Sequence, residues 1–246
     1  MYKFDPRGES VAADFRAIAL SQIDAALAAG QATEPARRTA LLEARRRTKK
    51  LRGLLRLVRP GFADFETENA ALRDAAAALS GLRDREVLAQ TLAALNLTHP
   101  DPVLTRIAAR FPPGESPTGA PEPLLTAFRD ALRDVRARAA SWDLTEDDAA
   151  TLLDGLRQTY RKCRRGMRRA DRIRTDFELH EWRKALKTHV FQLSLMREAA
   201  PDILAARRQL VDRVGDLLGS HHDLINLKAV LVRDPDRFGD DADRQR

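Results

Sequence analysis

The chain has 246 residues, enough for one large domain or two modest ones, and either can bury a hydrophobic core without disulfides or bound metals. Lys and Arg number 43 and Asp and Glu 36, giving a net charge of +7, and a composition 43% hydrophobic and 32% charged is typical of a helical bundle and argues against disorder. One cysteine, Cys163, excludes a disulfide framework and any metal site built from several thiolates.

Apolar residues recur three and four positions apart in almost every segment, whereas alternation of the strand kind hardly occurs. The sequence therefore predicts an all-α fold. The helices are expected, in chain order, at residues 10–29, 34–59, 62–80, 84–96, 101–110, 122–141, 146–173, 176–199, 201–218 and 222–233.

Local signals support several of these boundaries. Pro35 suits a first helical turn, and Pro60-Gly61 ends the second helix. Thr175-Asp-Phe-Glu178 predicts a capping box, in which the threonine side chain caps the helix that follows.

A Pro- and Gly-rich linker is predicted at residues 112–121, because its composition cannot continue a helix. It divides a region of 10–233 into halves of 10–111 and 122–233. The polar residues 234–246 are expected to form a solvated tail.

The two halves resemble each other when they are aligned with an offset of 138 positions. Glu43, Arg45 and Lys49 then match Glu181, Arg183 and Lys187. Further along, Leu79 and Gly81 match Leu217 and Gly219. This internal repeat predicts two similar helical units packed as a pseudo-symmetric pair.

Basic residues form three rows, each on one face of a predicted helix, which we call the basic stripes. The first contains Arg38, Arg45, Lys49, Arg52, Arg56 and Arg59; the second contains Arg157, Arg161, Arg164, Arg168 and Arg172; the third contains His180, Arg183, Lys187 and Arg197. Residues 37–59 hold ten basic residues and one acidic residue, and residues 157–197 hold thirteen and four. Acidic residues one turn away are mostly missing, so the stripes indicate a polyanion-binding face and not only a solvated surface.

The length of the first stripe, roughly 30 Å, favours a polymer over a mononucleotide. No glycine-rich phosphate loop is present in the sequence. An alternative is a helical protein that binds DNA or RNA, which basic stripes equally allow. A phosphohydrolase or polymerase would need metal-holding carboxylates near the phosphates, and the stripes contain few acids.

Four segments resemble motifs of the CHAD domain family, the conserved histidine α-helical domain. They are Glu43 to Pro60, Tyr160 to Arg165, His180 to Lys187 and Gly219 to Leu224, and the resemblance spans about residues 10–233. It implies two pseudo-symmetric four-helix-bundle halves packed together, with basic helices facing a central cavity or pore that binds inorganic polyphosphate. It also implies a stand-alone, non-catalytic binding module without cofactor or metal, in the cytoplasm and in some members at polyphosphate granules.

The resemblance assigns polyphosphate-binding roles by position. The expected residues are Arg45, Arg46, Lys49, Lys50, Arg52, Arg56, Arg161, Arg164, Arg165, Arg168, His180, Arg183, Lys184 and Lys187. The family motif has a histidine before the residue that corresponds to Glu43, but this chain has Leu42 there. In the second half, Val190 occupies the position that corresponds to Arg52. The two halves are therefore not expected to bind polyphosphate equally.

Other candidates are weaker. His221-His222-Asp223 is not expected to hold a metal, because neighbouring helical side chains diverge by about 100°. Helix capping by Asp223, or support of the basic stripes, is the preferred interpretation, and Asp84 is a similar candidate in the first half. Arginines next to Cys163 in the sequence are expected to lower the pKa of its thiol. We nevertheless interpret Cys163 as a residue without a role in binding or catalysis. The lack of a long apolar run and of a secretory signal predicts a soluble protein with no membrane partner.

Overall fold

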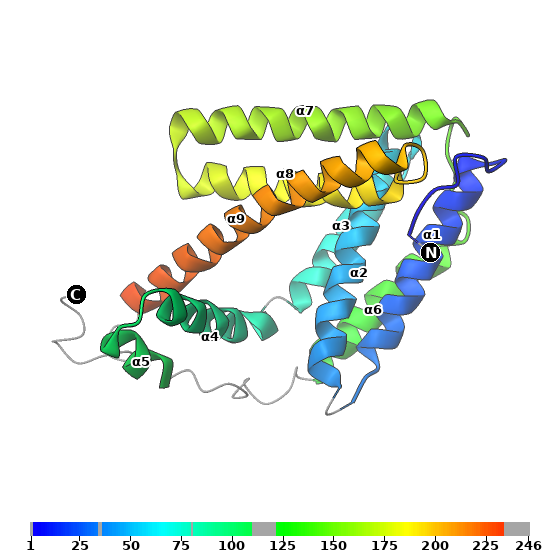
Figure 1. The fold of residues 1–246 in the computed structure, drawn as a ribbon. Helices are drawn as coiled ribbons and strands as arrows, with labels where there is room; N and C mark the ends of the chain where they lie inside the picture. Colours follow the sequence, from blue (N-terminus) through cyan, green and yellow to red (C-terminus); the bar gives the residue numbers. More distant parts are fainter. Residues whose placement is uncertain (1, 34–35, 80, 110–121, 234–246) are drawn as a thin grey trace.

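A computed structural model describes residues 2–33, 36–79, 81–109 and 122–233, and this part of the chain is helical without strands, which confirms the all-α prediction. Figure 1 shows the arrangement. The helices are α1 (Val11–Gly30), α2 (Arg37–Val58), the 3-10 turn η1 (Arg59–Gly61), α3 (Phe65–Ala78), α4 (Gly81–Thr98), α5 (Pro102–Ala109), α6 (Glu122–Ala139), α7 (Ala149–Ile173), α8 (Asp176–Leu195) and α9 (Pro201–Arg233).

Most predicted helix boundaries lie within three residues of the observed ones. The turn η1 follows α2 at Arg59–Gly61, which confirms the stop at Pro60. The Thr175 side chain accepts a hydrogen bond from the Glu178 N–H, which confirms the threonine cap. Pro35, the linker 112–121 and the tail 234–246 lie outside the described residues.

The predicted break between residues 218 and 222 is wrong, because α9 continues through it as one helix of 33 residues. Gly219 is buried, and the residues before and after it are in α-helical conformation. The side chain nearest to it belongs to Arg183 of α8. An added Cβ would meet Arg183 at an ordinary contact distance of 3.5 Å, so the packing of α9 on α8 does not require this glycine, and the glycine does not end the helix.

The helices α1, α2, α3 and α6 share the largest hydrophobic core. Each contacts two of the others, in the order α1, α2, α3, α6 and back to α1. Phe15 of α1 stacks on Trp142, with ring centroids 5.5 Å apart, and Phe62 packs against both. Trp142 is 2% exposed and is therefore a core residue.

Helix α6 packs on α1 and α3, although it follows the predicted linker and was placed in the second half. Arg138 of α6 donates two hydrogen bonds, of 2.6 and 2.9 Å, to the buried carboxylate of Glu68 on α3. A bidentate pair of this kind satisfies both carboxylate oxygens and fixes the position of the two helices. The division into halves of 10–111 and 122–233 stays a prediction.

A second group contains α7, α8 and α9, and it joins the first through α2, which contacts both α7 and α8. The helix bounds agree with the repeat: moved by 138 positions, α2 would cover 175–196, and α8 spans Asp176–Leu195. The far end of α9 packs on α4 through Leu88, Leu92 and Leu227, and Ile107 of α5 joins the same cluster.

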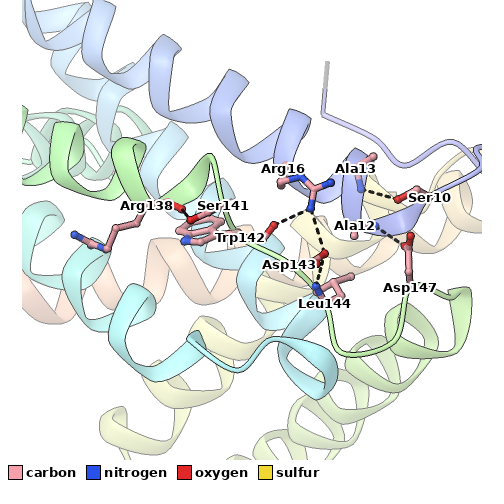
Figure 2. A network of polar contacts seen from close by, with 10 residues as sticks. All are labelled: Ser10, Ala12, Ala13, Arg16, Arg138, Ser141, Trp142, Asp143, Leu144 and Asp147. Atoms are coloured by element: carbon pink, nitrogen blue, oxygen red, sulfur yellow. Dashed lines mark hydrogen bonds and ion pairs between the residues drawn. The ribbon is translucent and has the colours of Figure 1, made fainter.

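Figure 2 shows polar contacts that tie the start of α1 to the segment between α6 and α7. The Asp147 carboxylate accepts from the Ala12 N–H at 2.6 Å, while Arg16 donates to the Trp142 carbonyl at 2.9 Å and lies 3.2 Å from the Asp143 carboxylate. Hydrogen bonds from Ser10 and the Ala12 backbone lower the pKa of Asp147. These contacts satisfy N–H groups that the first helical turn leaves unpaired.

No helix in the described part of the chain has both the length and the apolar character needed to cross a bilayer.

Gly155 is the tightest contact between the two groups. A Cβ added there would lie 1.7 Å from the backbone carbonyl oxygen of Leu57. We expect Gly155→Ala to force α7 away from α2 and to lower the free energy of unfolding by about 3 kcal/mol or more, as measured by urea denaturation.

Gly219→Ala is the matched control, because an added Cβ there would meet Arg183 at an ordinary contact distance of 3.5 Å. We expect this change to be neutral or to stabilise the protein by up to about 1 kcal/mol, since alanine is the better helix former. Equal effects of the two substitutions would contradict the close approach of α2 and α7.

Candidate functional site

Most residues of the basic stripes lie on three helices that contact one another, namely α2, α7 and α8. Arg59 lies in η1, and Arg197 lies beyond the end of α8 at Leu195, so neither is on the helix predicted for it. The side chains of the stripes nevertheless differ in environment. Those on α2 and α8 are mostly half-buried and bonded to the next helix of the chain, whereas those on α7 are exposed.

The α2 stripe lies against α3. Arg45 donates to the Leu79 carbonyl, and Arg52 donates to the Asn69 side chain at 3.1 Å. Arg56, one turn further on, donates to the Arg52 carbonyl at 3.2 Å. The predicted residues Arg45, Arg52 and Arg56 therefore lie together, and Lys49 on the same face is exposed.

Like charges are crowded along this face. Burial, together with the positive charges of Arg52 and Arg59, lowers the pKa of Arg56 to about 10. Burial and the nearby Arg73 lower the pKa of Arg52. A bound anion would offset this repulsion, so the face is prepared electrostatically for negative charge.

Arg46 and Lys50 lie on another side of α2. Arg46 is 3.7 Å from the Glu43 carboxylate, and the Lys50 ammonium lies 5.0 Å from the centroid of the Tyr2 ring. Burial, followed by the charges of Arg46 and Arg47, lowers the pKa of Lys50. The structure thus separates these two predicted residues from the row formed by Arg45, Arg52 and Arg56.

The α7 residues are the most accessible of the set. Arg161, Arg164, Arg165 and Arg168 are exposed, and none of them forms an ion pair with a carboxylate in the described part of the chain. The guanidinium of Arg164 lies 5.9 Å from the centroid of the Tyr160 ring. Four guanidiniums without a carboxylate partner in the described residues, on two turns of one helix, form a surface suited to phosphate oxygens.

Sequence reasoning missed Arg207. Its guanidinium lies 4.8 Å from the Tyr160 ring centroid, so α9 adds a cation beside the α7 arginines. The pair Arg207-Arg208 is visible in the sequence, but only the packing of α9 shows that Arg207 faces Tyr160.

On α8, His180 and Arg183 face α9. The Nδ1 atoms of His180 and His222 are 3.2 Å apart, and the ring centroids are 4.2 Å apart. Burial lowers the pKa of both histidines, and each is lowered further by nearby positive charges that include Arg183. Since one ring must accept the hydrogen bond that the other donates, the two rings cannot both be imidazolium without losing this hydrogen bond.

Lys187 and Lys184 already have acidic partners. The Lys187 ammonium donates to Asp212 at 3.1 Å and to Asp216 at 2.7 Å, and Lys184 pairs with Glu181. Burial alone would lower the pKa of Lys187, but the bonds to the two aspartates outweigh it and raise the pKa. Phosphate would have to compete with these carboxylates.

The structure corrects the predictions for Asp223 and Cys163 and does not describe the side chain of Asp84. Asp223 lies inside α9 and therefore cannot cap a helix, although its neighbour His222 does support His180. Burial raises the pKa of Cys163 to about 11, against the expected lowering by arginines. The side chain of Asp84 lies outside the described residues.

The described residues contain no cluster of metal-ligating side chains. Among the residues that the structure describes, no three His, Cys, Asp or Glu side chains lie close enough together to hold a metal ion.

The chain is thus an all-helical protein with basic side chains on adjoining helices. A family model described as the CHAD domain matches residues 21–232, and the chain belongs to this family. No curated protein and no solved structure matches the chain.

His189 provides a test of the packing beneath this site. It is buried on α8, 6.1 Å from Tyr160 between ring centroids, and burial together with Arg207 lowers its pKa from 6.5 to about 4. Between these values the unfolded chain binds a proton that the folded chain excludes, so stability falls as the pH falls from 6.5 to about 4.

We expect this loss to reach about 3 kcal/mol at the acidic end and to be absent in His189→Leu, as measured by urea denaturation across the pH range. An unchanged pH dependence in the variant would show that His189 does not titrate abnormally.

Proposed function

We propose that this protein binds inorganic polyphosphate without turning it over. The observation that carries the proposal is the group of exposed α7 arginines without acidic partners in the described part of the chain, Arg161, Arg164, Arg165 and Arg168. Membership of the CHAD domain family supports the same ligand.

A linear polyanion fits these residues better than a mononucleotide. The second stripe extends from Arg157 to Arg172, about 22 Å along α7 at 1.5 Å per residue. Guanidinium groups engage two phosphate oxygens at once, and successive groups on one helix face can follow successive phosphates of a chain.

The half-buried residues of α2 and α8 have a different role in this proposal. Arg45, Arg52 and Lys187 keep their internal partners and contribute positive potential, while the α7 arginines and Lys49 contact the ligand. Fixed charges on adjoining helices act together over distances comparable with the screening length at physiological salt. In the finer form of the proposal, the helices face a central pore between two bundle halves.

We further propose that the protein acts in the cytoplasm and associates with polyphosphate granules through this surface. Binding without catalysis is consistent with the partners of the acidic residues beside the stripes: Asp212 and Asp216 accept from Lys187, and Asp154 pairs with Arg157.

The test is titration with long-chain polyphosphate over a salt series, comparing the wild type with Arg161→Gln/Arg164→Gln/Arg168→Gln. Each phosphate contact releases counterions, so losing three contacts should lower the slope of log affinity against log salt by about 2. We expect affinity at physiological salt to fall by about tenfold or more.

The control variant is Arg129→Gln/Arg133→Gln/Arg136→Gln, which removes the same charge from α6 arginines that pair with Glu122, Asp130 and Asp24. We expect it to bind nearly as the wild type does. Equal losses in the two variants would mean that only net charge matters. Tighter binding of duplex DNA than of polyphosphate, at equal phosphate concentration, would replace the proposal with the nucleic-acid alternative.

The facing histidines predict a pH dependence of binding. A bound polyanion favours the protonated imidazole, so proton uptake accompanies binding and affinity should rise as the pH falls below the ordinary value of 6.5. Isothermal titration in buffers of different ionisation enthalpy should detect this proton uptake.

We expect His180→Gln to remove most of the pH dependence. His99→Gln, which changes an exposed histidine at the end of α4, should keep it. The same pH dependence in both variants would exclude His180 from the site.

A further inference from the structure

Helix α9 exposes a row of large apolar side chains at one spacing. Ile203, Leu210, Leu217 and Leu224 stand seven residues apart, and their exposed fractions are 72%, 56%, 73% and 41%. Seven residues make about two helical turns, so the four side chains lie on one side of the helix. We call this row the α9 ridge; isolated exposed leucines are ordinary on protein surfaces, but four large apolar side chains along one side of a helix indicate an interaction site.

The ridge is not the side that holds α9 to the rest of the protein. The buried residues Gly215 and Gly219 pack against the Lys187 and Arg183 side chains of α8. Beyond the ridge, Leu227 packs into the cluster with α4. Figure 1 shows α9 running between these two attachments, from α8 to α4.

The internal repeat provides a comparison for the α9 ridge, because the corresponding residues of the first half are buried. Moved by 138 positions, Phe65, Leu72 and Leu79 of the first half correspond to Ile203, Leu210 and Leu217. These three counterparts are only 5%, 0% and 0% exposed, and α6 is packed on α3. The same apolar pattern is therefore covered by a helix in the first half and uncovered on α9.

We propose that a second copy of this chain covers the α9 ridge, with the two α9 helices antiparallel across a twofold axis. An evenly spaced ridge is complementary to itself: when Leu210 lies opposite Leu217 of the second copy, Ile203 lies opposite its Leu224. The α9 helix of the second copy then covers the ridge, as α6 covers the apolar side of α3.

Charges beside the ridge favour this pairing. Arg213 and Asp216 have exposed side chains on one flank, and in the antiparallel arrangement Arg213 of each copy lies near Asp216 of the other. Arg213 has no ion pair with a carboxylate in the described part of the chain, whereas Asp216 already accepts from Lys187 and keeps a second oxygen for Arg213.

The test is light scattering after gel filtration, together with sedimentation equilibrium, on the full chain at micromolar concentrations without polyphosphate. We expect a mass twice 27.5 kDa for the wild type. Leu210→Glu/Leu217→Glu should give 27.5 kDa, because dimerisation would bury four unpaired carboxylates. Since both side chains are exposed, circular dichroism should show an unchanged helix content.

Leu97→Glu is the control, because Leu97 of α4 is 83% exposed and lies outside the ridge; this variant should remain dimeric.

Arg213→Glu should raise the dimer dissociation constant about tenfold, and adding Asp216→Arg should restore it. A monomeric wild type, or a dimer that survives Leu210→Glu/Leu217→Glu, would overturn the proposal. A dimer insensitive to Arg213→Glu would overturn the antiparallel register. Polyphosphate binding is measured separately, so either proposal can fail alone.

Discussion

The two-sided character of α2 is the constraint on which the rest of the structure depends. This helix contacts α1, α3, α7 and α8, and its leucines at 51, 54, 55 and 57 are almost completely buried. Its cations must therefore lie at the edges of a dry core, where each contact to the Leu79 carbonyl or the Asn69 amide compensates for lost water. Apolar packing thus determines where the positive charge is held.

This constraint separates two kinds of basic residue. Arg45 and Arg52 of α2 and Lys187 of α8 are held by internal partners, so these cations have little freedom to follow a ligand. Arg161, Arg165 and Arg168 of α7 have exposed side chains without a carboxylate partner in the described part of the chain, so ordering them on a ligand would cost side-chain entropy. The combination gives a rigid source of potential beside an adaptable contact surface.

Local signals in the sequence were sufficient for most helix boundaries and for the Thr175 cap, because these depend on residues within one or two turns. Other features depend on contacts between distant segments. His180 meets His222 across 42 residues, and α9 continues through Gly219 because packing on Arg183 outweighs the low helix propensity of glycine. Burial raised the pKa of Cys163 for the same reason, since the sequence shows its neighbours but not its depth.

The position of α6 has a consequence for folding during synthesis. Phe128, Leu132 and Val135 of α6 are fully buried in the core that α1, α2 and α3 form. The ribosome must therefore release residues up to Ala139 before that core can close, and the apolar faces of the first three helices stay open until then. A chaperone that binds nascent chains would meet these open apolar faces in this interval, before α7 has emerged from the ribosome.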